Sequence, residues 1–219
     1  MPGRGRFITF EGGEGAGKST QLALLAERLR AEGVQVVATR EPGGTEGAEA
    51  VRALLVTGAT DRWSPLAESL LHFAARADHL ERVIRPALAR GDWVLCDRFT
   101  DSSMAYQGYG LGLGRETVAA LARLVVGETT PDLTLILDIP PGEGLARAEA
   151  AAPGGETRYE RMGQAFHAAL REAFRDIAAR EAPRCALVDA ARPREAVAAD
   201  ILALVRARLG PGGTDGHGA

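Results

Sequence analysis

Short apolar runs alternate with longer amphipathic stretches along most of the chain. Apolar residues predominate in the short runs, which predicts strands at residues 6–11, 34–40, 92–97, 133–138 and 185–189. The longer stretches repeat apolar residues every three or four positions, which predicts helices at 21–29, 45–55, 64–90, 116–126, 159–179 and 194–209. Because strands and helices alternate, we expect an α/β fold in which helices cover both faces of a parallel sheet.

Particular residues mark the ends of these helices. Gly33 stops the first helix, Thr45 is a helix N-cap, and Pro65 takes the first position of the helix at 64–90. Pro86 is expected to kink or split that helix near its end, because proline has no N–H to donate. A turn at 140–142 leads into a further helix.

Glycines and polar residues predominate in the remaining segments. Residues 99–114 are dotted with glycines, and residues 151–155 interrupt a helix and are expected to be mobile. Residues 210–219 contain no apolar anchor, which predicts a flexible tail. Because no internal repeat or linker divides the rest, we expect residues 1–209 to form a single domain.

Composition narrows the class of protein. The chain has 219 residues, 46% of them hydrophobic and 25% charged, which suits a globular domain with a sizeable core. The net charge of −3 argues against a nucleic acid polymer or a membrane surface as partner, and no apolar run approaches the roughly 20 residues that span a bilayer. No signal-peptide core precedes the first strand, and Cys96 and Cys185 lie far apart in apolar surroundings. We therefore expect a cytoplasmic protein with buried, unpaired thiols.

One stretch carries recognisable chemistry, the match to G-x-x-x-x-G-K-[ST] at residues 12–20. Its glycines let backbone N–H groups point into one hollow at a helix N-terminus, where phosphate is favoured. Lys18 is suited to bridge the β- and γ-phosphates of a nucleotide, and the Ser19 hydroxyl to hold Mg²⁺. A strand before the stretch and a helix after it supply the context that such a site requires. We therefore predict a nucleotide site at Gly12, Gly13, Glu14, Gly15, Ala16, Gly17, Lys18, Ser19 and Thr20.

A phosphate-binding loop does not by itself separate a kinase from a GTPase switch or an ATP-driven motor. Guanine-specific GTPases usually carry Asn-Lys-x-Asp after a strand, and this sequence has no such stretch. Many motors carry a strand that ends in paired acids, whereas here the strand ends in a single Asp97 followed by Arg98. A kinase is therefore favoured.

Several stretches together resemble the thymidylate (dTMP) kinase family; they are residues 11–20, 39–45, 97–99, 105–108 and 131–135. The resemblance runs from about residue 7 to residue 198. It implies a P-loop nucleoside monophosphate kinase fold with a five-stranded parallel sheet, and a lid at about 147–160. It also implies phosphoryl transfer from ATP-Mg²⁺ to dTMP, giving dTDP and ADP in dTTP biosynthesis, and a homodimer.

Two arginines at strand ends are candidates for binding the phosphate of dTMP. Arg40 and Arg98 lie where ligands collect in open α/β sheets, and a guanidinium can bind phosphate through two parallel hydrogen bonds. The alternative for each is a surface ion pair. Asp97 is expected to orient the Mg²⁺ shell together with Ser19, and its alternative is a strand-end cap.

Other side chains are candidates for binding the base and sugar. By resemblance, Phe73 stacks on thymine and Arg76 donates to a base carbonyl; three residues apart, they share one helix face. The alternative is that Phe73 belongs to the core, since apolar stripes usually face it. The resemblance also assigns Ser103 to the pyrimidine edge and Tyr106 to the sugar, and Gln107 is a further polar candidate, although Ser and Gln are common in loops for turn chemistry alone.

The cation that completes catalysis is expected to come from the lid. The phosphate loop carries Glu14 where some family members carry an arginine, which resembles the bacterial pattern with a lid arginine. Glu14 is then free to face the sugar of the acceptor or the Mg²⁺ water shell. The lid candidates are Arg147, Arg158 and Arg161, and the predicted catalytic set is Lys18, Arg98, Arg158 and Arg147. Arg147 is equally suited to stack on adenine, and at least one of the three is a solvated helix arginine.

Two other functions stay open. The first is a kinase for another nucleoside monophosphate or a deoxynucleoside, and the second is a nucleotide-dependent switch that binds a protein partner. The helix at 64–90 is the candidate dimer face, or it is wholly occupied by its own core.

Overall fold

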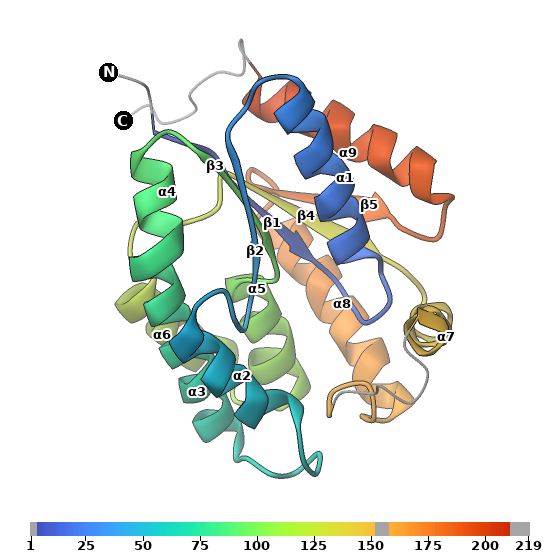
Figure 1. Ribbon diagram of the computed structural model, residues 1–219. Coiled ribbons are helices and arrows are strands. Elements are labelled where there is room, and N and C mark those ends of the chain that lie inside the picture. The colour runs from blue at the N-terminus through green and yellow to red at the C-terminus, as the bar shows by residue number, and fades with distance from the viewer. Residues whose placement is uncertain (1–3, 152–157, 211–219) are drawn as a thin grey trace.

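The computed structural model describes residues 4–151 and 158–210. Its centre is a sheet of parallel strands in the order β2-β3-β1-β4-β5 (Figure 1). The strands are β1 (Phe7–Glu11), β2 (Val36–Arg40), β3 (Trp93–Asp97), β4 (Leu133–Asp138) and β5 (Cys185–Asp189). The predicted five-stranded parallel sheet is confirmed.

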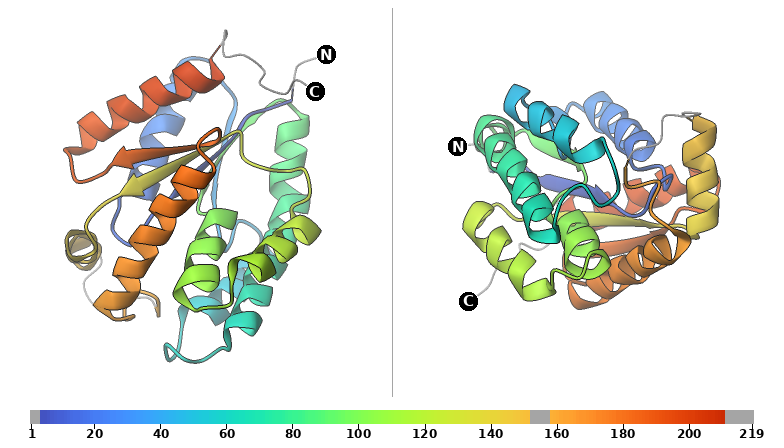
Figure 2. Two further views of the ribbon diagram at one scale, coloured as in Figure 1. Left: turned by 180° about the vertical axis from the view of Figure 1, so that it is seen from behind. Right: turned by 90° about the horizontal axis from the view of Figure 1, so that it is seen from below.

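Helices cover both faces of this sheet. They are α1 (Lys18–Ala31), α2 (Glu46–Val56), α3 (Pro65–His79), α4 (Arg85–Ala89), α5 (Thr100–Ser103), α6 (Arg115–Val125), α7 (Pro141–Ala151), α8 (Gln164–Arg180) and α9 (Arg194–Leu209), with π-helical segments η1 (Leu80–Ile84) and η2 (Met104–Gly110). Helices α1 and α9 pack on one face, while η1, α4 and α8 pack on the other (Figures 1 and 2). Strand side chains alternate between the two: Ile8 and Phe10 pack with α1 and α9, whereas Phe7 packs with η1 and α4.

The helix predicted at 64–90 is a continuous run whose hydrogen bonding changes near its end. Ser64 caps it by accepting from the Ala67 N–H at 3.3 Å. In η1 the Arg85 N–H donates to the Leu80 carbonyl, five residues back. Pro86 follows directly and cannot donate to the carbonyl four residues before it, so a wider turn stands where the α-helical pattern stops. The helix therefore divides near Pro86 as predicted, without an intervening loop.

Two segments differ from the helical pattern read from the sequence. The glycine-dotted residues 99–114 contain α5 and η2. A Cβ on Gly110 would lie 2.7 Å from the ring of Phe166, so this glycine permits close helix packing and does not break the helix. Helix α8 begins at Gln164 and not at Tyr159, because residues 159–162 form turns before the N-cap Gly163. Tyr159 is therefore free to enter the cavity described below.

Three further expectations concern the thiols, the membrane and the mobile segments. Cys96 and Cys185 are buried free thiols, as predicted. No helix within residues 4–151 and 158–210 combines the length and apolarity needed to cross a membrane. Most of the interruption at 151–155 and of the tail at 210–219 lies outside the described residues.

Candidate active site

The phosphate-binding loop connects the buried end of β1 to the first turn of α1. Gly12, Gly15 and Gly17 have φ angles of 128°, 64° and 86°, which favour glycine. Helix α1 begins at Lys18, and its first turn carries no acidic side chain. The N–H groups of that turn have no partner within the helix, and the positive end of its dipole is not neutralised. The loop is therefore suited to bind phosphate.

Lys18 is folded back over this loop. Its Nζ donates to the carbonyl oxygen of Gly13 at 2.7 Å and to that of Gly12 at 3.2 Å. Burial, together with the charge of Arg98, lowers the pKa of Lys18 to about 8. Phosphate oxygens form stronger, charge-assisted hydrogen bonds than carbonyls do, so a bound triphosphate can take over both interactions and keep the lysine charged.

The two predicted metal ligands meet beside the loop. The hydroxyl of Ser19, in the first turn of α1, donates to Oδ2 of Asp97 at the end of β3. A hydroxyl and a carboxylate are hard oxygen ligands of the kind that Mg²⁺ takes alongside phosphate and water oxygens. The residues present therefore fit Mg²⁺.

Arg98 links the loop to the rest of the site. Its φ of 67° lies in the left-handed region, and it is the one non-glycine residue of the described chain with a positive φ. Its Nη1 donates to the Gly12 carbonyl at 3.0 Å and the Ser102 hydroxyl at 3.1 Å. Its Nη2 donates to Glu14 at 3.0 Å, and the Tyr106 hydroxyl donates to the same carboxylate oxygen at 2.7 Å. Burial alone would raise the pKa of Glu14, but the charge of Arg98 lowers it to about 2.

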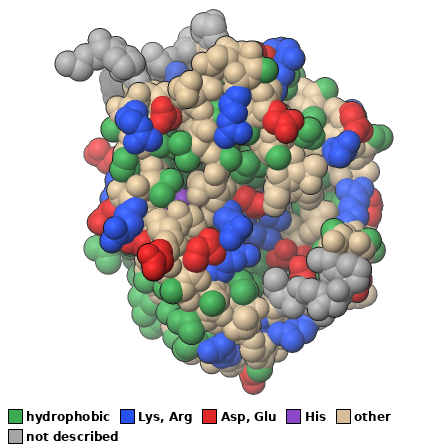
Figure 3. All heavy atoms as spheres, in the orientation of Figure 1, with side chains coloured by type: hydrophobic (Ala, Val, Ile, Leu, Met, Phe, Trp, Pro, Cys, Tyr) green, Lys and Arg blue, Asp and Glu red, His purple; other side chains and the backbone are tan. Residues whose placement is uncertain are grey.

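Arg40 and Arg98 line the same open cavity above the phosphate loop, together with Lys18. On the face seen in Figure 3, basic and acidic side chains meet around a hollow near the middle of the molecule. Nη2 of Arg40 donates to both carboxylate oxygens of Glu49, at 3.0 and 3.1 Å. Both partners are exposed, and exposed ion pairs contribute little stability, so a phosphate can replace this carboxylate at small cost. The structure thus brings the two predicted phosphate ligands to one cavity.

A second, more enclosed cavity adjoins the first. Glu14 and Arg98 line both cavities. Polar and aromatic side chains complete the second one, among them Arg76, Ser103, Tyr106, Gln107 and Tyr159. Its mixture of an apolar wall and a few polar groups is typical of a small-molecule site.

The α3 residues of this cavity differ from the prediction at one position. Phe73 is 2% exposed, does not line the cavity, and has its ring centroid 4.6 Å from Cζ of Arg76. This placement favours the alternative that Phe73 belongs to the core. His72 lies one turn before Arg76 and lines the cavity, and its Nε2 shares a hydrogen bond with the Tyr159 hydroxyl at 2.9 Å. Burial, together with the charge of Arg76, lowers the pKa of His72 to about 3, so the imidazole is neutral.

Ser103 and Gln107 also line the enclosed cavity, on α5 and η2. The Ser103 hydroxyl accepts from Nη1 of Arg76 at 3.1 Å. Nε2 of Gln107 donates to Glu68 at 2.8 Å, while its buried Oε1 has no partner among the described residues. Buried polar atoms are rarely left unpaired, and a ligand N–H can pair with this oxygen if the Gln107 side chain turns it toward the cavity.

The three candidate lid arginines lie in different places. Arg147 lines the open cavity, and its Nη1 donates to the Ala190 carbonyl at 2.9 Å. Arg158 is fully buried in an ion pair with Glu68, beside the enclosed cavity. Arg161 is exposed, and its Nη2 donates to the Gly58 carbonyl at 2.6 Å. Among the described residues that line the open cavity, Arg147 is therefore the one lid candidate.

Sequence reasoning missed several residues that line these cavities; they are Glu41, Arg52, His72 and Tyr159. Arg52 lies on α2, three residues after Glu49, so the two side chains share one helix face. Since Glu49 pairs with Arg40, this spacing could have indicated that Arg52 also lies near the site. His72 and Phe73 are four and three residues from Arg76, so helical spacing did not choose between them. Tyr159 was assigned to a helix, although Gly163 marks a later start.

Comparisons with known proteins agree with one another. The family model described as thymidylate kinase matches residues 10–201. A thymidylate kinase of Caulobacter vibrioides is 58% identical over 207 residues, covering 94% of this chain and 99% of that protein. One of a Bradyrhizobium species is 52% identical over 209 residues, covering 95% and 92%. The crystal structure of thymidylate kinase from Ehrlichia chaffeensis is similar with a TM-score of 0.74 and 36% identity, covering 93% of this chain and 99% of that one.

Proposed function

The chain belongs to the thymidylate kinase family and phosphorylates dTMP for dTTP synthesis, and we propose that its two adjoining cavities bind ATP and dTMP for direct phosphoryl transfer. One observation carries this proposal: Glu14 and Arg98 line both cavities. The open cavity contains the phosphate loop, and the enclosed one has the mixed apolar and polar lining of a base and sugar site. A phosphate at their junction can therefore belong to an acceptor whose base occupies the enclosed cavity.

ATP is proposed to bind in the open cavity. The loop amides and Lys18 bind its β- and γ-phosphates, because the lysine hydrogen bonds to Gly12 and Gly13 can be transferred to phosphate oxygens. Arg147 lies beside the loop that follows β5, where its guanidinium is suited to pack on adenine.

Mg²⁺ is proposed to be held by Ser19 and Asp97, whose oxygens meet beside the loop. When bound there, it neutralises charge on the β- and γ-phosphates. The carboxylate of Asp97 and the hydroxyl of Ser19 fix the place of the metal relative to Lys18.

The phosphate of dTMP is proposed to lie between Arg40 and Arg98, and its sugar beside Glu14 and Tyr106. Nη1 and Nη2 of Arg98 already form three hydrogen bonds that fix its guanidinium. A fixed guanidinium binds phosphate with less loss of side-chain entropy than a free one.

The base is proposed to lie against His72, with Arg76, Ser103 and Gln107 at its edge. The Gln107 amide is suited to pair with the imide N–H of thymine if its buried Oε1 turns toward the cavity. Nη1 and Nη2 of Arg76 each donate one hydrogen bond within the protein and keep a second N–H for a base carbonyl. Phe73 then packs beside Arg76 on the core side and does not stack on the base.

The reaction needs no covalent intermediate. Lys18 and Arg98 neutralise negative charge that spreads over the transferred group, and the two cavities hold donor and acceptor in line. Closing of the lid over the open cavity is proposed to exclude water, so that ATP is not hydrolysed. A lid arginine adds a further cation; Arg147 needs the smaller movement, since Arg158 must first leave Glu68.

A cytoplasmic homodimer is proposed as the working form. Leu54 of α2 and Leu66 and Leu70 of α3 are 40%, 47% and 49% exposed. Figure 3 shows hydrophobic side chains gathered at the lower left, over α2 and α3. Such patches on soluble proteins mark contact surfaces. Light scattering of the wild-type chain and of Leu70→Glu tests this: we expect a dimer and a monomer, and a monomeric wild type overturns the proposal.

The acceptor is tested by a coupled assay that follows ADP production with ATP and each nucleoside monophosphate in turn. We expect the highest kcat/KM with dTMP. If turnover is highest with another monophosphate, that monophosphate is the acceptor. If no monophosphate is turned over, a nucleotide-dependent switch is the better explanation.

A further inference from the structure

Arg76 is held in a fixed orientation by three hydrogen bonds. Its Nε donates to Oε2 of Glu41 at 2.7 Å, its Nη1 to the Ser103 hydroxyl at 3.1 Å, and its Nη2 to the Phe99 carbonyl at 2.9 Å. Arg76 is 2% exposed and Glu41 4% exposed. A buried carboxylate needs further hydrogen bonds to offset its loss of water, so the second oxygen of Glu41 must also be paired.

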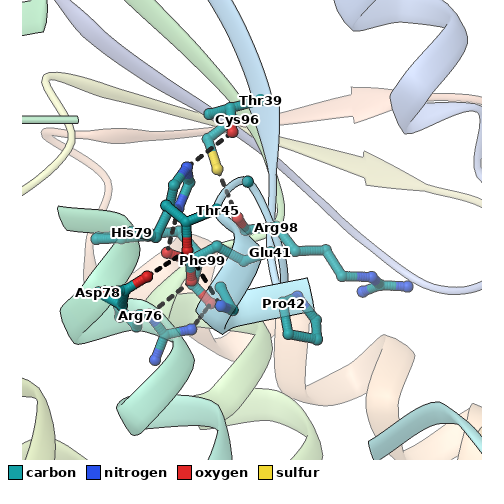
Figure 4. A network of polar contacts seen from close by, with 12 residues as sticks. Thr39, Glu41, Pro42, Thr45, Arg76, Asp78, His79, Cys96, Arg98 and Phe99 are labelled. Atoms are coloured by element: carbon teal, nitrogen blue, oxygen red, sulfur yellow. Dashed lines mark hydrogen bonds and ion pairs between the residues drawn. The ribbon is translucent and has the colours of Figure 1, made fainter. Parts of the chain in front are cut away.

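That second oxygen is paired through two residues outside both cavities. Nδ1 of His79 lies 3.1 Å from Oε1 of Glu41, and Nε2 of His79 lies 2.7 Å from the Thr39 hydroxyl (Figure 4). His79 is fully buried. Because a carboxylate only accepts, Nδ1–H of His79 donates to Glu41, and Nε2 pairs with the Thr39 hydroxyl. The order Thr39, His79, Glu41, Arg76 is then one continuous chain of hydrogen bonds.

The secondary structure places these four hydrogen-bonded residues next to one another. Thr39 lies in β2 and Glu41 directly follows its last residue, and both side chains contact His79 of α3. Arg76 and His79 are three residues apart and share one face of α3. A Cβ on Gly44 would lie 2.5 Å from Nε2 of His79, so the loop covers the Thr39–His79 hydrogen bond closely.

We propose that Thr39 and His79 are positioning residues that hold Glu41, and through it the guanidinium of Arg76, in the geometry that binds the acceptor base. This inference rests on the proposed function, because it gives Arg76 a base to bind. Arg40 lies between Thr39 and Glu41 in sequence and lines the open cavity. One short segment therefore sets the position of the base contact and of the phosphate contact at once.

The test uses Thr39→Val, which keeps the shape of the side chain and removes the hydroxyl that pairs with His79. Loss of one hydrogen bond to a buried partner is expected to raise the KM for dTMP by about threefold to tenfold. The KM for ATP should stay unchanged, and so should the Ki of 2-deoxyribose 5-phosphate, an acceptor fragment that has no base. Thr39→Ser restores the hydroxyl and should restore the KM.

Two controls separate positioning from general damage to the loop. Thr45→Val makes the same change in the loop that follows β2, where the hydroxyl caps α2 and contacts Asp78; we expect lower stability and an unchanged KM for dTMP. In a background of Arg76→Met, Thr39→Val should have no further effect on that KM, because the two changes remove the same interaction. His79→Asn keeps a donor toward Glu41 but loses the hydrogen bond to Thr39, so its KM for dTMP should resemble that of Thr39→Val.

Several outcomes would overturn the inference. They are an unchanged KM for dTMP in Thr39→Val and His79→Asn, an equal rise in the Ki of 2-deoxyribose 5-phosphate, or additive effects with Arg76→Met. These KM and Ki measurements require that the wild-type chain turn over dTMP. If the wild type neither binds nor phosphorylates dTMP, the proposed function fails and this inference fails with it.

Discussion

Two neighbouring positions of α3 offer a direct test of which side chain meets the base. His72 lines the enclosed cavity, whereas Phe73 is 2% exposed and lies outside it. We therefore compare His72→Ala with Phe73→Leu. The first removes a ring from the cavity wall, and the second removes part of a ring from the core beside Arg76.

The expected magnitudes follow from these positions. Stacking of a base on a ring contributes about 1–3 kcal/mol, and about 1.4 kcal/mol is a tenfold change, so His72→Ala should raise the KM for dTMP roughly fivefold to 150-fold. Its stability should change little, because the Tyr159 hydroxyl keeps its hydrogen bond to Glu68 at 3.0 Å. Phe73→Leu should lower the free energy of unfolding by about 1–2 kcal/mol through lost packing, with the KM for dTMP nearly unchanged.

The measurement is steady-state kinetics with dTMP varied at saturating ATP, alongside urea unfolding of each variant. His72→Phe is the control, because it keeps a ring and should keep the KM near that of the wild type. Since the pKa of His72 is lowered to about 3, the KM should show no step from this group at neutral pH. The reasoning is refuted if Phe73→Leu raises the KM for dTMP and His72→Ala leaves it unchanged.

Three further predictions follow from the charged groups of the site. Lys18→Ala and Arg98→Ala should each lower kcat at least about a hundredfold while circular dichroism stays that of the folded chain, since both cations neutralise the transferred phosphoryl group. The folded pKa of Glu14, about 2, lies below its ordinary 4.5, so this carboxylate stabilises the fold by about 3 kcal/mol above pH 4.5 and loses that contribution as the pH falls toward 2. Glu14→Gln should therefore flatten the acid limb of stability measured by urea unfolding. Arg158→Met should lower stability by about 3–5 kcal/mol in the same assay, because it leaves Glu68 buried without its ion-pair partner, and a neutral effect would contradict this.

Local signals account for most of what could be predicted. The phosphate loop could be predicted from one short stretch, because its glycines, the helix N-terminus and the lysine all lie within residues 12–20. Strand ends placed Asp97, Arg98 and Arg40 at one edge of the sheet, since parallel strands point the same way. Thr45 was predicted as an N-cap, and it accepts from the Ala48 N–H at 3.1 Å.

Other features depend on contacts between segments far apart in sequence. The burial of Arg158 against Glu68 joins positions 90 residues apart, and no local pattern specifies it. The glycines at 108 and 110 suggested irregular structure, yet packing of Gly110 against Phe166 makes a helix there the better solution.

The amino-acid sequence alone specified the alternating strands and helices, the phosphate loop, and the family that these imply. Each of these features depends on interactions within a few residues. Folding in three dimensions chose His72 over Phe73 for the cavity wall and buried Arg158, because the exact rotation of a helix and the partner of a charge are set by whole-molecule packing.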